Sequence, residues 1–367
     1  MRVVQPAAPQ ADPRFTIAVI KGEDAAPEAV DATLELLEAL DAPLDFTFPI
    51  VGSEGERIYG STFAPAAQAV IDDSDATLFG ATSGPSGIAL FYLRFGKATF
   101  ANVRPARMIP GARSPLADPA GIDFVVVREN LEGLYSGIEG PLSDLAAMQF
   151  HHPLGGRLAD RDGMFSLKVV TADASERVAR FAFELARHRA TRRKPQPRVT
   201  LGAKHNILSA DQLFADAASR VSDDYPDVDF DENFIDNLAR RMVAEPQALD
   251  VVVVPNFAGD ITSDVAAGVI GGLGLMPSGC YGHDYAYFEP PHGTAPDLTG
   301  LGVINPTAQM LSASMLLDHL GLTDLATRVR HGIDTVFAGG RTLPRDQGGT
   351  ASTTEFTTAV IAATQDT

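Results

Sequence analysis

The sequence has little of several residue types, and each shortage excludes a class of protein. Cys280 is the single cysteine among 367 residues, so a disulfide framework is excluded and a reducing, cytoplasmic compartment is expected. No apolar run is long enough to cross a membrane. Basic residues are outnumbered, with 29 Lys and Arg against 47 Asp and Glu, which gives a net charge of −18. That balance argues against nucleic acid or an anionic membrane as partner. Tryptophan is absent, which carries no functional information.

The common dinucleotide fingerprint is also missing. Residues 15–20 read as a buried strand and residues 27–40 as an amphipathic helix, and strands and helices alternate further along, which predicts an α/β protein. The turn at residues 21–26 lacks GxGxxG, the usual phosphate-binding motif after a first strand. Residues 1–14 lack the apolar core of a secretion signal, so we expect a loose tail there.

The chain does contain a pair of carboxylates behind a buried strand. Four valines at residues 251–254 predict a strand covered on both faces, and Pro255 ends it. Gly259 is expected to allow a tight turn, after which Asp260 would open a helix. That helix stacks Asp260 and Asp264 on one face, and hard divalent cations prefer such oxygen ligands. The alternative is an acidic helix start that the helix macrodipole favours.

Basic side chains gather in one apolar stretch of this acidic chain. Arg94, Arg104 and Arg107 lie close together in sequence. A guanidinium group grips a carboxylate through two parallel hydrogen bonds, so the cluster is a candidate clamp for an anionic substrate. Surface arginines in salt bridges are the alternative. Arg128 directly follows an apolar strand at residues 123–127, and sites gather at the carboxyl ends of such strands.

Other candidates have plain structural alternatives. Tyr135 is either a general acid or an amphipathic packing residue. Lys204 stands at the exit of a short strand, as a base or as a surface ammonium group. Asp236 follows two apolar residues and has a helix-start carboxylate as its alternative. The irregular segment 136–164 is expected to be an arm or a lid, and the loop over residues 292–306 is long enough to be functional.

Together these stretches resemble one family, the β-decarboxylating dehydrogenases of 2-hydroxy acids (isopropylmalate, isocitrate, homoisocitrate and tartrate dehydrogenases). The resemblance is closest to the isopropylmalate and homoisocitrate branch and runs from about Phe15 to the C-terminus. Its most specific pieces are Leu93-Arg94, Ala101-Asn-Val-Arg-Pro105, Arg128-Glu129, Glu132-Gly-Leu-Tyr135, Lys204 with Asn206, Asn256 with Gly259-Asp260, Ser263-Asp264, and Glu289-Pro-Pro-His-Gly-Thr-Ala-Pro-Asp297.

The resemblance implies a particular α/β fold, in which two domains share a mixed central sheet and the GxGxxG motif is absent. The first, cofactor-side domain would combine residues 15–101 with residues 272–367. The second domain, residues 102–271, would carry the metal, substrate and dimer contacts. Its segment 136–164 would be an arm that clasps a twin subunit.

The resemblance also implies catalytic roles. Lys204 looks like the base that takes the substrate's hydroxyl proton as hydride leaves for NAD, and Tyr135 looks like the acid that protonates the enol after loss of CO₂. In this family the site is built across a homodimer, so Lys204 and Asp236 would reach into the neighbour's cleft. The ligands of Mg²⁺ or Mn²⁺ would be Asp260 and Asp264 with Asp236 of the partner subunit. The residues implied to bind a dicarboxylate hydroxy acid are Leu90, Phe91, Arg94, Arg104, Arg128 and Ile207.

The implied cofactor site lies in the loop after Glu289. Asp297 occupies the position that meets the adenosine ribose, where a carboxylate accepts bonds from both hydroxyls and repels a 2′-phosphate, which favours NAD over NADP. The family's first turn, Gly-Asp-Gly-Ile-Gly-Pro-Glu, is Gly22-Glu-Asp-Ala-Ala-Pro-Glu28 in this chain and has lost two glycines. The residues implied to contact NAD are His292, Gly293, Thr294, Ala295, Asp297 and Asn305.

The helix before Arg94 reads the variable group of the substrate in this family. Ile88, Leu90 and Phe91 make it apolar here, so we expect a 3-substituted malate with an uncharged substituent. Gly87 replaces the Glu of isopropylmalate enzymes, and the extra Arg of homoisocitrate enzymes is missing. The alternatives are homoisocitrate, isocitrate or tartrate dehydrogenase activity, a non-catalytic regulatory paralogue, and a plain divalent-ion-binding protein.

Overall fold

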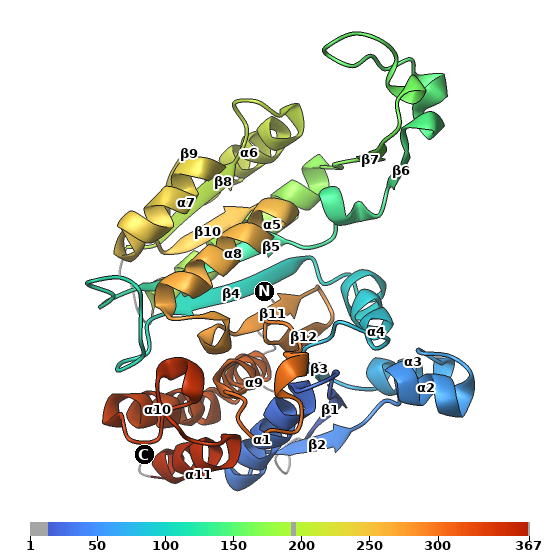
Figure 1. Cartoon of the computed structure of the whole chain (residues 1–367). Helices are drawn as coiled ribbons and strands as arrows, with labels where there is room; N and C mark the ends of the chain where they lie inside the picture. Colours follow the sequence, from blue (N-terminus) through green and yellow to red (C-terminus); the bar gives the residue numbers. More distant parts are fainter. Residues whose placement is uncertain (1–13, 192–195, 366–367) are drawn as a thin grey trace.

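The centre of the computed structural model, which describes residues 14–191 and 196–365, is a mixed sheet of ten strands (Figure 1). Their order across the sheet is β2-β1-β3-β12-β11-β4-β5-β10-β8-β9. The strands are β1 (Phe15–Ile20), β2 (Leu44–Thr47), β3 (Ala76–Phe79), β4 (Ala101–Arg107), β5 (Asp123–Glu129), β8 (Arg198–Ala203), β9 (Asp229–Phe234), β10 (Val251–Val254), β11 (Ser278–Tyr281) and β12 (Ala286–Glu289).

Helices cover both faces of this sheet, as the parallel connections between its strands require. The α-helices are α1 (Ala26–Ala39), α2 (Gly52–Tyr59), α3 (Pro65–Asp72), α4 (Gly87–Phe91), α5 (Ala172–Ala190), α6 (Ser209–Ser222), α7 (Ile235–Ala244), α8 (Asn256–Ile270), α9 (Thr307–His319), α10 (Thr323–Gly339) and α11 (Thr353–Thr364). Shorter helical turns are the π-helical turn Tyr92–Gly96 and the 3₁₀ turns Leu134–Ser136, Leu142–Met148, Leu158–Asp160, Pro246–Ala248, Leu273–Leu275, Pro296–Leu298 and Arg345–Gln347.

The pairing of the strands confirms the predicted α/β fold with a mixed sheet. On one side β2, β1, β3 and β12 are parallel neighbours, and on the other side β5, β10, β8 and β9 are parallel neighbours. Between these groups β11 and β4 pair antiparallel with each other and with the strands beside them. The division into domains at residues 101–102 and 271–272 stays a prediction.

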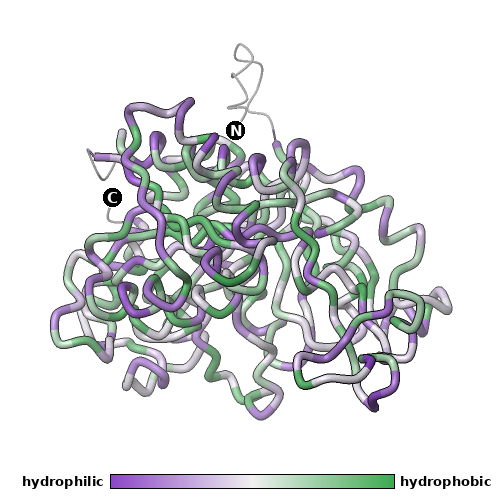
Figure 2. Tube along the Cα trace, turned by 90° about the horizontal axis from the view of Figure 1, so that it is seen from above, coloured by the Kyte–Doolittle hydropathy of each residue, from purple (hydrophilic) through white to green (hydrophobic). Residues whose placement is uncertain are grey.

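Local sequence signals account for several helix ends. Pro27 occupies the first turn of α1, where a missing N–H costs nothing. Thr171 caps α5 by accepting a hydrogen bond from Ala174 N, and α11 begins with a capping box between Ser352 and Glu355. These helices bury apolar faces against the sheet, so that hydrophobic stretches run through the middle of the trace in Figure 2 and many outer loops are hydrophilic.

A long excursion leaves the body of the molecule between β5 and α5 and projects outward (Figure 1). It holds the two-stranded antiparallel ribbon of β6 (Glu139–Pro141) and β7 (Met164–Ser166). It covers the segment 136–164 that the sequence predicted as an arm or a lid. Apolar side chains stand exposed on it, among them Ile138, Met148, Phe150, Leu154 and Met164.

One expectation about local structure was wrong, and one strand was not predicted. Helix α8 begins at Asn256, directly after Pro255, so Gly259 and Asp260 lie inside its first turns and no tight turn precedes Asp260. The segment before Asp236 is strand β9, which pairs with β8 over its whole length; its alternation of charged and apolar residues is that of an edge strand. The tail predicted over residues 1–14 lies outside the described residues, apart from Arg14.

Within residues 14–191 and 196–365, no helix combines the length and the apolar character that crossing a bilayer requires.

Candidate active site

The register of the three central strands gathers polar side chains on one face of the sheet. Asn102 of β4 lies opposite Arg128 of β5 and opposite Cys280 of β11. Directly opposed residues point to the same face, and so does a residue two positions along the strand. Arg104 therefore shares the face of Asn102 and Arg128. All of them are buried, which places two guanidinium groups inside the middle of the sheet.

Helix α8 lies against this face because a glycine allows it to come close. A Cβ at Gly259 would stand 2.7 Å from both Cβ and Cγ of Arg128. Real Cβ contacts are not that short, so any larger residue would push the helix off β5. The close approach sets Asn256, Asp260 and Ser263 of α8 against the two arginines, as the next contacts show.

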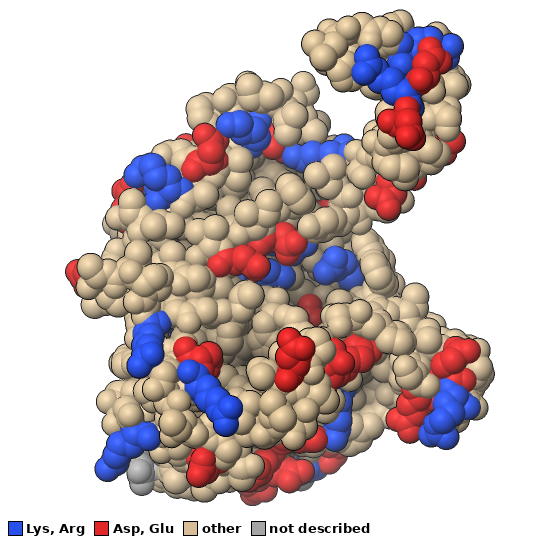
Figure 3. Space-filling view, viewed as in Figure 1, with Lys and Arg blue, Asp and Glu red and all other residues tan. Residues whose placement is uncertain are grey.

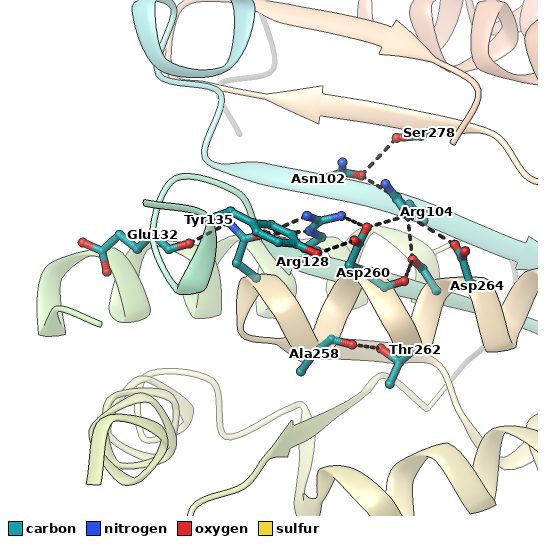
Figure 4. A network of polar contacts seen from close by, with 12 residues as sticks. Asn102, Arg104, Arg128, Glu132, Tyr135, Ala258, Asp260, Thr262, Asp264 and Ser278 are labelled. Atoms are coloured by element: carbon teal, nitrogen blue, oxygen red, sulfur yellow. Dashed lines mark hydrogen bonds and ion pairs between the residues drawn. The ribbon is translucent and has the colours of Figure 1, made fainter. Parts of the chain in front are cut away.

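Arg128 is the centre of a network that ties β5, α8 and the turn after β5 together (Figure 4). Its Nε and Nη2 donate hydrogen bonds to Asn256 Oδ1 at 3.0 and 2.8 Å. Its Nη1 forms an ion pair with Asp260 Oδ1. Asn256 in turn donates from Nδ2 to the carbonyl oxygen of Glu132 at 2.7 Å, and the Tyr135 hydroxyl donates to Asp260 Oδ2 at 3.0 Å.

Arg104 links the same helix to β4. Its Nη1 donates to Ser263 Oγ at 2.7 Å and lies 3.7 and 3.8 Å from carboxylate oxygens of Asp260 and Asp264. Its Nε donates to Asn102 Oδ1 at 3.3 Å. The aspartates therefore stand side by side on the exposed edge of the network, with the arginines beneath them. Figure 3 shows basic and acidic atoms meeting in a hollow between the two halves of the molecule.

The electrostatics of the site favour a ligand with negative charge. Burial, then repulsion from Arg104, lowers the pKa of Arg128 to about 10, although Asp260 opposes the shift. Two buried nitrogen donors are also unsatisfied: within the described part of the chain, neither Arg94 Nε nor Asn102 Nδ2 has a hydrogen-bond acceptor. An anion beside Arg104 and Arg128 would relieve the repulsion between them.

Two carboxylates of the site have raised pKa values. Burial raises the pKa of Asp264, the nearby Asp260 raises it further, and Arg104 acts against this. Burial also raises the pKa of Glu289, at the end of β12, while the charges of Arg94, Arg104 and Arg128 lower it. The sequence motif that begins at Glu289 did not predict that this carboxylate lies near the arginines.

The wall next to Arg94 is apolar. Helix α4 continues into the π-helical turn that carries Arg94, and π-helical turns are frequent at functional sites. Phe91 and Phe95 stack with their ring centroids 6.0 Å apart and planes inclined by 11°, and both rings are exposed. Ile88 is exposed one turn earlier, whereas Leu90 is half-buried.

Lys204 and Asp236 form a separate ion pair. Lys204 Nζ lies 2.7 Å from Asp236 Oδ1, between the ends of β8 and α7, and this bond lowers the pKa of Asp236. Neither side chain joins the contacts of Arg104 or Arg128 recorded for the described residues. Ile207, three residues after Lys204, is highly exposed. In the described part of one chain, no group of three or more His, Cys, Asp or Glu side chains is arranged to hold a metal ion.

The predicted cofactor residues lie in one loop, residues 290–306, between β12 and α9. Gly293, Ala295 and Asp297 are exposed, and burial lowers the pKa of His292, which keeps its imidazole neutral at pH 7. Asn305 donates from Nδ2 to Asp346 at 3.0 Å. Exposed groups on a loop with fixed ends suit a ligand that lies along the surface.

One arginine of the predicted cluster lies elsewhere. Arg107 makes a two-point ion pair with Asp334 of α10, at 3.0 and 2.7 Å. It stands at the far end of β4, three residues beyond Arg104, and therefore on the other face of the sheet. Its role is to join α10 to the sheet, so the structural alternative holds for Arg107.

Comparison with known proteins agrees with this geometry. A family described as isocitrate/isopropylmalate dehydrogenase matches residues 16–360. The chain belongs to the isocitrate/isopropylmalate dehydrogenase family. It is therefore an NAD(P)-dependent decarboxylating oxidoreductase, of a family whose members also use a divalent metal ion.

Relatives in this family cover nearly the whole chain. The 3-isopropylmalate dehydrogenase of Archaeoglobus fulgidus is 37% identical over 345 residues, which is 94% of this chain and 98% of that enzyme. The isocitrate/homoisocitrate dehydrogenase of Thermus thermophilus is 40% identical over 360 residues, 95% of this chain and 98% of that enzyme. The crystal structure of isocitrate dehydrogenase from Methylococcus capsulatus superposes with a TM-score of 0.82 at 33% identity, covering 96% of this chain and 99% of that one.

Proposed function

We propose that the protein oxidises and decarboxylates a 3-substituted malate with an apolar substituent, with NAD as hydride acceptor and Mg²⁺ or Mn²⁺ as metal ion. The observation that carries this proposal is the buried pair Arg104 and Arg128 beneath two aspartates, next to an apolar helix. Cationic groups of this kind neutralise the two carboxylates that all such substrates share. The apolar wall decides which third group is accepted.

Substrate binding rests on Arg94, Arg104 and Arg128. The unpartnered Nε of Arg94 and the lowered pKa of Arg128 support a clamp that gains its full set of partners when a dianion enters. Exposed Phe91, and Leu90 on the turn before Arg94, suit an alkyl or aryl group. A third carboxylate against these side chains would lose its hydration without a partner, which disfavours isocitrate and homoisocitrate.

The donor set fits a hard divalent cation. Asp260 and Asp264 offer carboxylate oxygens on one helix face, and Asp236 of the partner subunit would supply the third carboxylate. A cation held by these carboxylates would supply Lewis-acid stabilisation of negative charge on the substrate. Within one chain Arg104 and Arg128 hold the aspartates in place, so their positions are set before a metal ion arrives.

Proton transfers would fall to Lys204 and Tyr135. Burial raises the pKa of Tyr135, and its hydrogen bond to Asp260 raises it further, so the phenol stays protonated at neutral pH and can donate. Its place beside the metal aspartate supports the role of acid that protonates the enol at C3. Lys204 would take the hydroxyl proton at C2, working in the cleft of the partner subunit, while NAD accepts the hydride.

Exposed apolar residues support a homodimer in which each cleft is completed by the other chain. Phe257 and Ile261 on α8 and Val243 on α7 are exposed, as are the apolar side chains of the arm at residues 136–164. In the proposed dimer the partner subunit would cover these side chains. Asp297, exposed in the loop over residues 290–306, supports NAD rather than NADP because its carboxylate would repel a 2′-phosphate.

The deciding experiment is a substrate panel. Purified protein is mixed with NAD or NADP, Mn²⁺ or Mg²⁺, and malates that carry methyl, isopropyl, benzyl, carboxymethyl or carboxyethyl groups at C3, with tartrate as a further member. We expect kcat/KM to be highest for an apolar substituent with NAD. A maximum for a substrate with a third carboxylate would contradict the apolar assignment. Absence of turnover on every member, with no binding of NAD, would favour a non-catalytic paralogue.

A further inference from the structure

Three loops meet at the carboxyl ends of neighbouring strands. The turn at residues 21–25 follows β1, the loop at residues 80–86 follows β3, and the loop at residues 290–306 follows β12. The chain goes from β1 to β2 on one side and to β3 on the other, so this is a switch point of the sheet, where open α/β folds bind ligands. Contacts between these loops therefore bear on how the cofactor site is formed.

Asp24 lies at a backbone position that most side chains avoid. Its φ angle is +54°, in the left-handed region, where the family's turn has a glycine. Aspartate tolerates this region better than most residues. Gly22 in the same turn is also left-handed, and a Cβ there would stand 2.1 Å from Ala81 O of the loop after β3. The turn thus keeps the shape of a glycine-rich turn while gaining a carboxylate.

That carboxylate is bonded to the cofactor loop. Thr294 donates from Oγ1 to Asp24 Oδ2 at 2.5 Å, and Ala25 N donates to Thr294 O at 3.1 Å. Thr294 Oγ1 also lies 3.0 Å from Ser83 Oγ of the loop after β3. Thr294 is buried although most of its neighbours in the loop are exposed. One threonine side chain therefore connects all three loops, and Asp24 is its charged partner.

The other end of the loop is held by a second carboxylate. Glu28, on the first turn of α1, accepts hydrogen bonds from Gly302 N at 3.2 Å and Ile304 N at 3.0 Å. The Thr353 hydroxyl of α11 lies within hydrogen-bond distance of both Glu28 Oε1 and Ile304 O. The stretch between these two anchor points carries Asp297, so its freedom is limited from both sides.

We propose that Asp24 is a positioning residue that fastens the loop at residues 290–306 in its cofactor-binding shape before the cofactor arrives. The proposal rests on the proposed use of NAD by this loop. A loop that is already ordered loses less conformational entropy on binding, so the contact between Asp24 and Thr294 raises the affinity for NAD without touching the reacting atoms. The carboxylate replaces a missing glycine and supplies a bond that glycine does not have.

The test compares two substitutions of Asp24 with a matched control. Asp24→Gly removes the carboxylate and leaves a residue that adopts the left-handed conformation without strain. Asp24→Ala removes the same carboxylate but puts alanine, which disfavours that conformation, in its place. Asp41, at φ +51° in the turn after α1, is the control, because Asp41→Gly makes the same change away from the loop. The readouts on the dimeric protein are hydrogen exchange of the amides at residues 293–304, calorimetric binding of NAD, and kcat.

For Asp24→Gly we expect about fivefold faster exchange across the loop and about fivefold weaker NAD binding, with kcat within twofold of the unmodified protein. Asp24→Ala is expected to show the same changes and a lower melting temperature, and Asp41→Gly to show neither change. Unaltered exchange and NAD affinity in Asp24→Gly would overturn the proposal.

Thr294→Val gives an independent check. It removes the hydroxyl group that bonds both Asp24 and Ser83, so its effect on exchange should be at least that of Asp24→Gly, and the double variant should be no worse than Thr294→Val alone. Additive effects would contradict a direct bond. Hydrogen exchange reports on the loop without cofactor, so it separates the two proposals: if NAD fails to bind the unmodified protein, the cofactor assignment falls, while the exchange result still decides whether Asp24 orders the loop.

Discussion

Ser263 and Thr262 are neighbours on α8, but their hydroxyl groups serve different partners. Ser263 Oγ accepts from buried Arg104 at 2.7 Å, whereas Thr262 Oγ1 donates to Ala258 O of its own helix at 2.8 Å (Figure 4). Ser263→Ala should remove the shortest of the contacts that orient the guanidinium group, raising KM for the hydroxy acid about tenfold, with kcat within about twofold. Steady-state kinetics measures this, and Thr262→Ser is the control that should change neither constant.

Glu289 gives the fold a pH dependence of known sign. Its folded pKa is raised above the ordinary value of 4.5, mainly by burial, so the ionised form is the less stable one in the folded protein. Stability is therefore gained as the pH falls through the folded pKa and is lost as it rises. Glu289→Gln cannot ionise, so it should melt at a higher temperature than the unmodified protein at pH 8. The difference should shrink toward pH 4.5, and a pH-independent difference in thermal melts would contradict this assignment.

At this scale the sequence predicts residue types better than contacts. Buried Arg104 and Arg128 follow from basic residues in apolar strands, and their inclusion in one network agrees with the predicted clamp. Arg107 has the same local signal, and only the alternation of side chains along β4 separates it from Arg104. Strand boundaries were needed for that separation. The acceptor role of Asn256 depends on how α8 lies on β5, which a linear motif does not encode.

Helix α8 offers a matched pair of glycines for testing its packing on the sheet. Gly259 faces Arg128 with no room for a Cβ, whereas a Cβ on Gly268 would meet no atom within 4 Å. Gly259→Ala should lower the free energy of unfolding by about 1–3 kcal/mol and raise KM for the substrate as the helix shifts. Gly268→Ala should raise that free energy by about 0.5–1 kcal/mol because alanine favours the helix. Urea unfolding followed by circular dichroism measures both, and equal effects would contradict the packing argument.

Helix α4 carries the expected selectivity for the substrate. Phe91→Ala removes an exposed ring that stacks on Phe95, so apolar burial of the substituent should be lost. We expect kcat/KM for isopropylmalate or benzylmalate to fall about tenfold and that for methylmalate to change about twofold or less. Competition assays on the panel measure the ratio. Ile58→Ala, an exposed apolar residue of α2, is the control; an equal loss on all substrates would point to a disturbed clamp instead.

Element boundaries show where pattern reasoning stops. Four valines predicted β10, and the helix after it is present, but α8 starts four residues earlier than Asp260 because Pro255 is well suited to precede a first helical turn. Strand β9 was missed because half of its six residues are charged, namely Asp229, Asp231 and Glu232, which is unusual for a strand. Both misses come from giving local composition more weight than the neighbouring strand or helix.

For the molecule as a whole, the shared-site proposal has a direct genetic test. Lys204→Met leaves the arginine and aspartate cleft intact, and Asp260→Asn leaves Lys204 and Asp236 intact. Each homodimer should be inactive. A mixed dimer would combine the intact cleft of one chain with the intact lysine of the other, which gives one working site out of two. Because random pairing makes about half of the dimers mixed, it should restore about a quarter of the unmodified activity.

The complementation test requires that both variants still assemble. Size-exclusion chromatography of each variant, alone and co-expressed, checks this. Assembled but wholly inactive mixtures would mean that Lys204 serves the cleft of its own chain or acts elsewhere, which would contradict a site made from two subunits.

The overall architecture followed from the sequence more fully than its details. Alternating strands and helices predict parallel pairing, and the family resemblance supplied the mixed character of the sheet, which its strand order confirms. The proposed partner chain lies beyond what the fold of one chain can test. Lys204 pairs with Asp236, apart from the ion pairs of Arg104 and Arg128, as the proposal of a site shared between two chains requires.

The antiparallel pairing of β11 with β4 bears on how this molecule can move. Hydrogen bonds run without interruption from one half of the sheet to the other, across the floor of the hollow that holds the arginines. Domains joined by flexible linkers can rotate about a hinge, but here such a rotation would distort the continuous hydrogen bonding of the sheet. Any closure around a bound molecule would therefore have to twist the sheet itself.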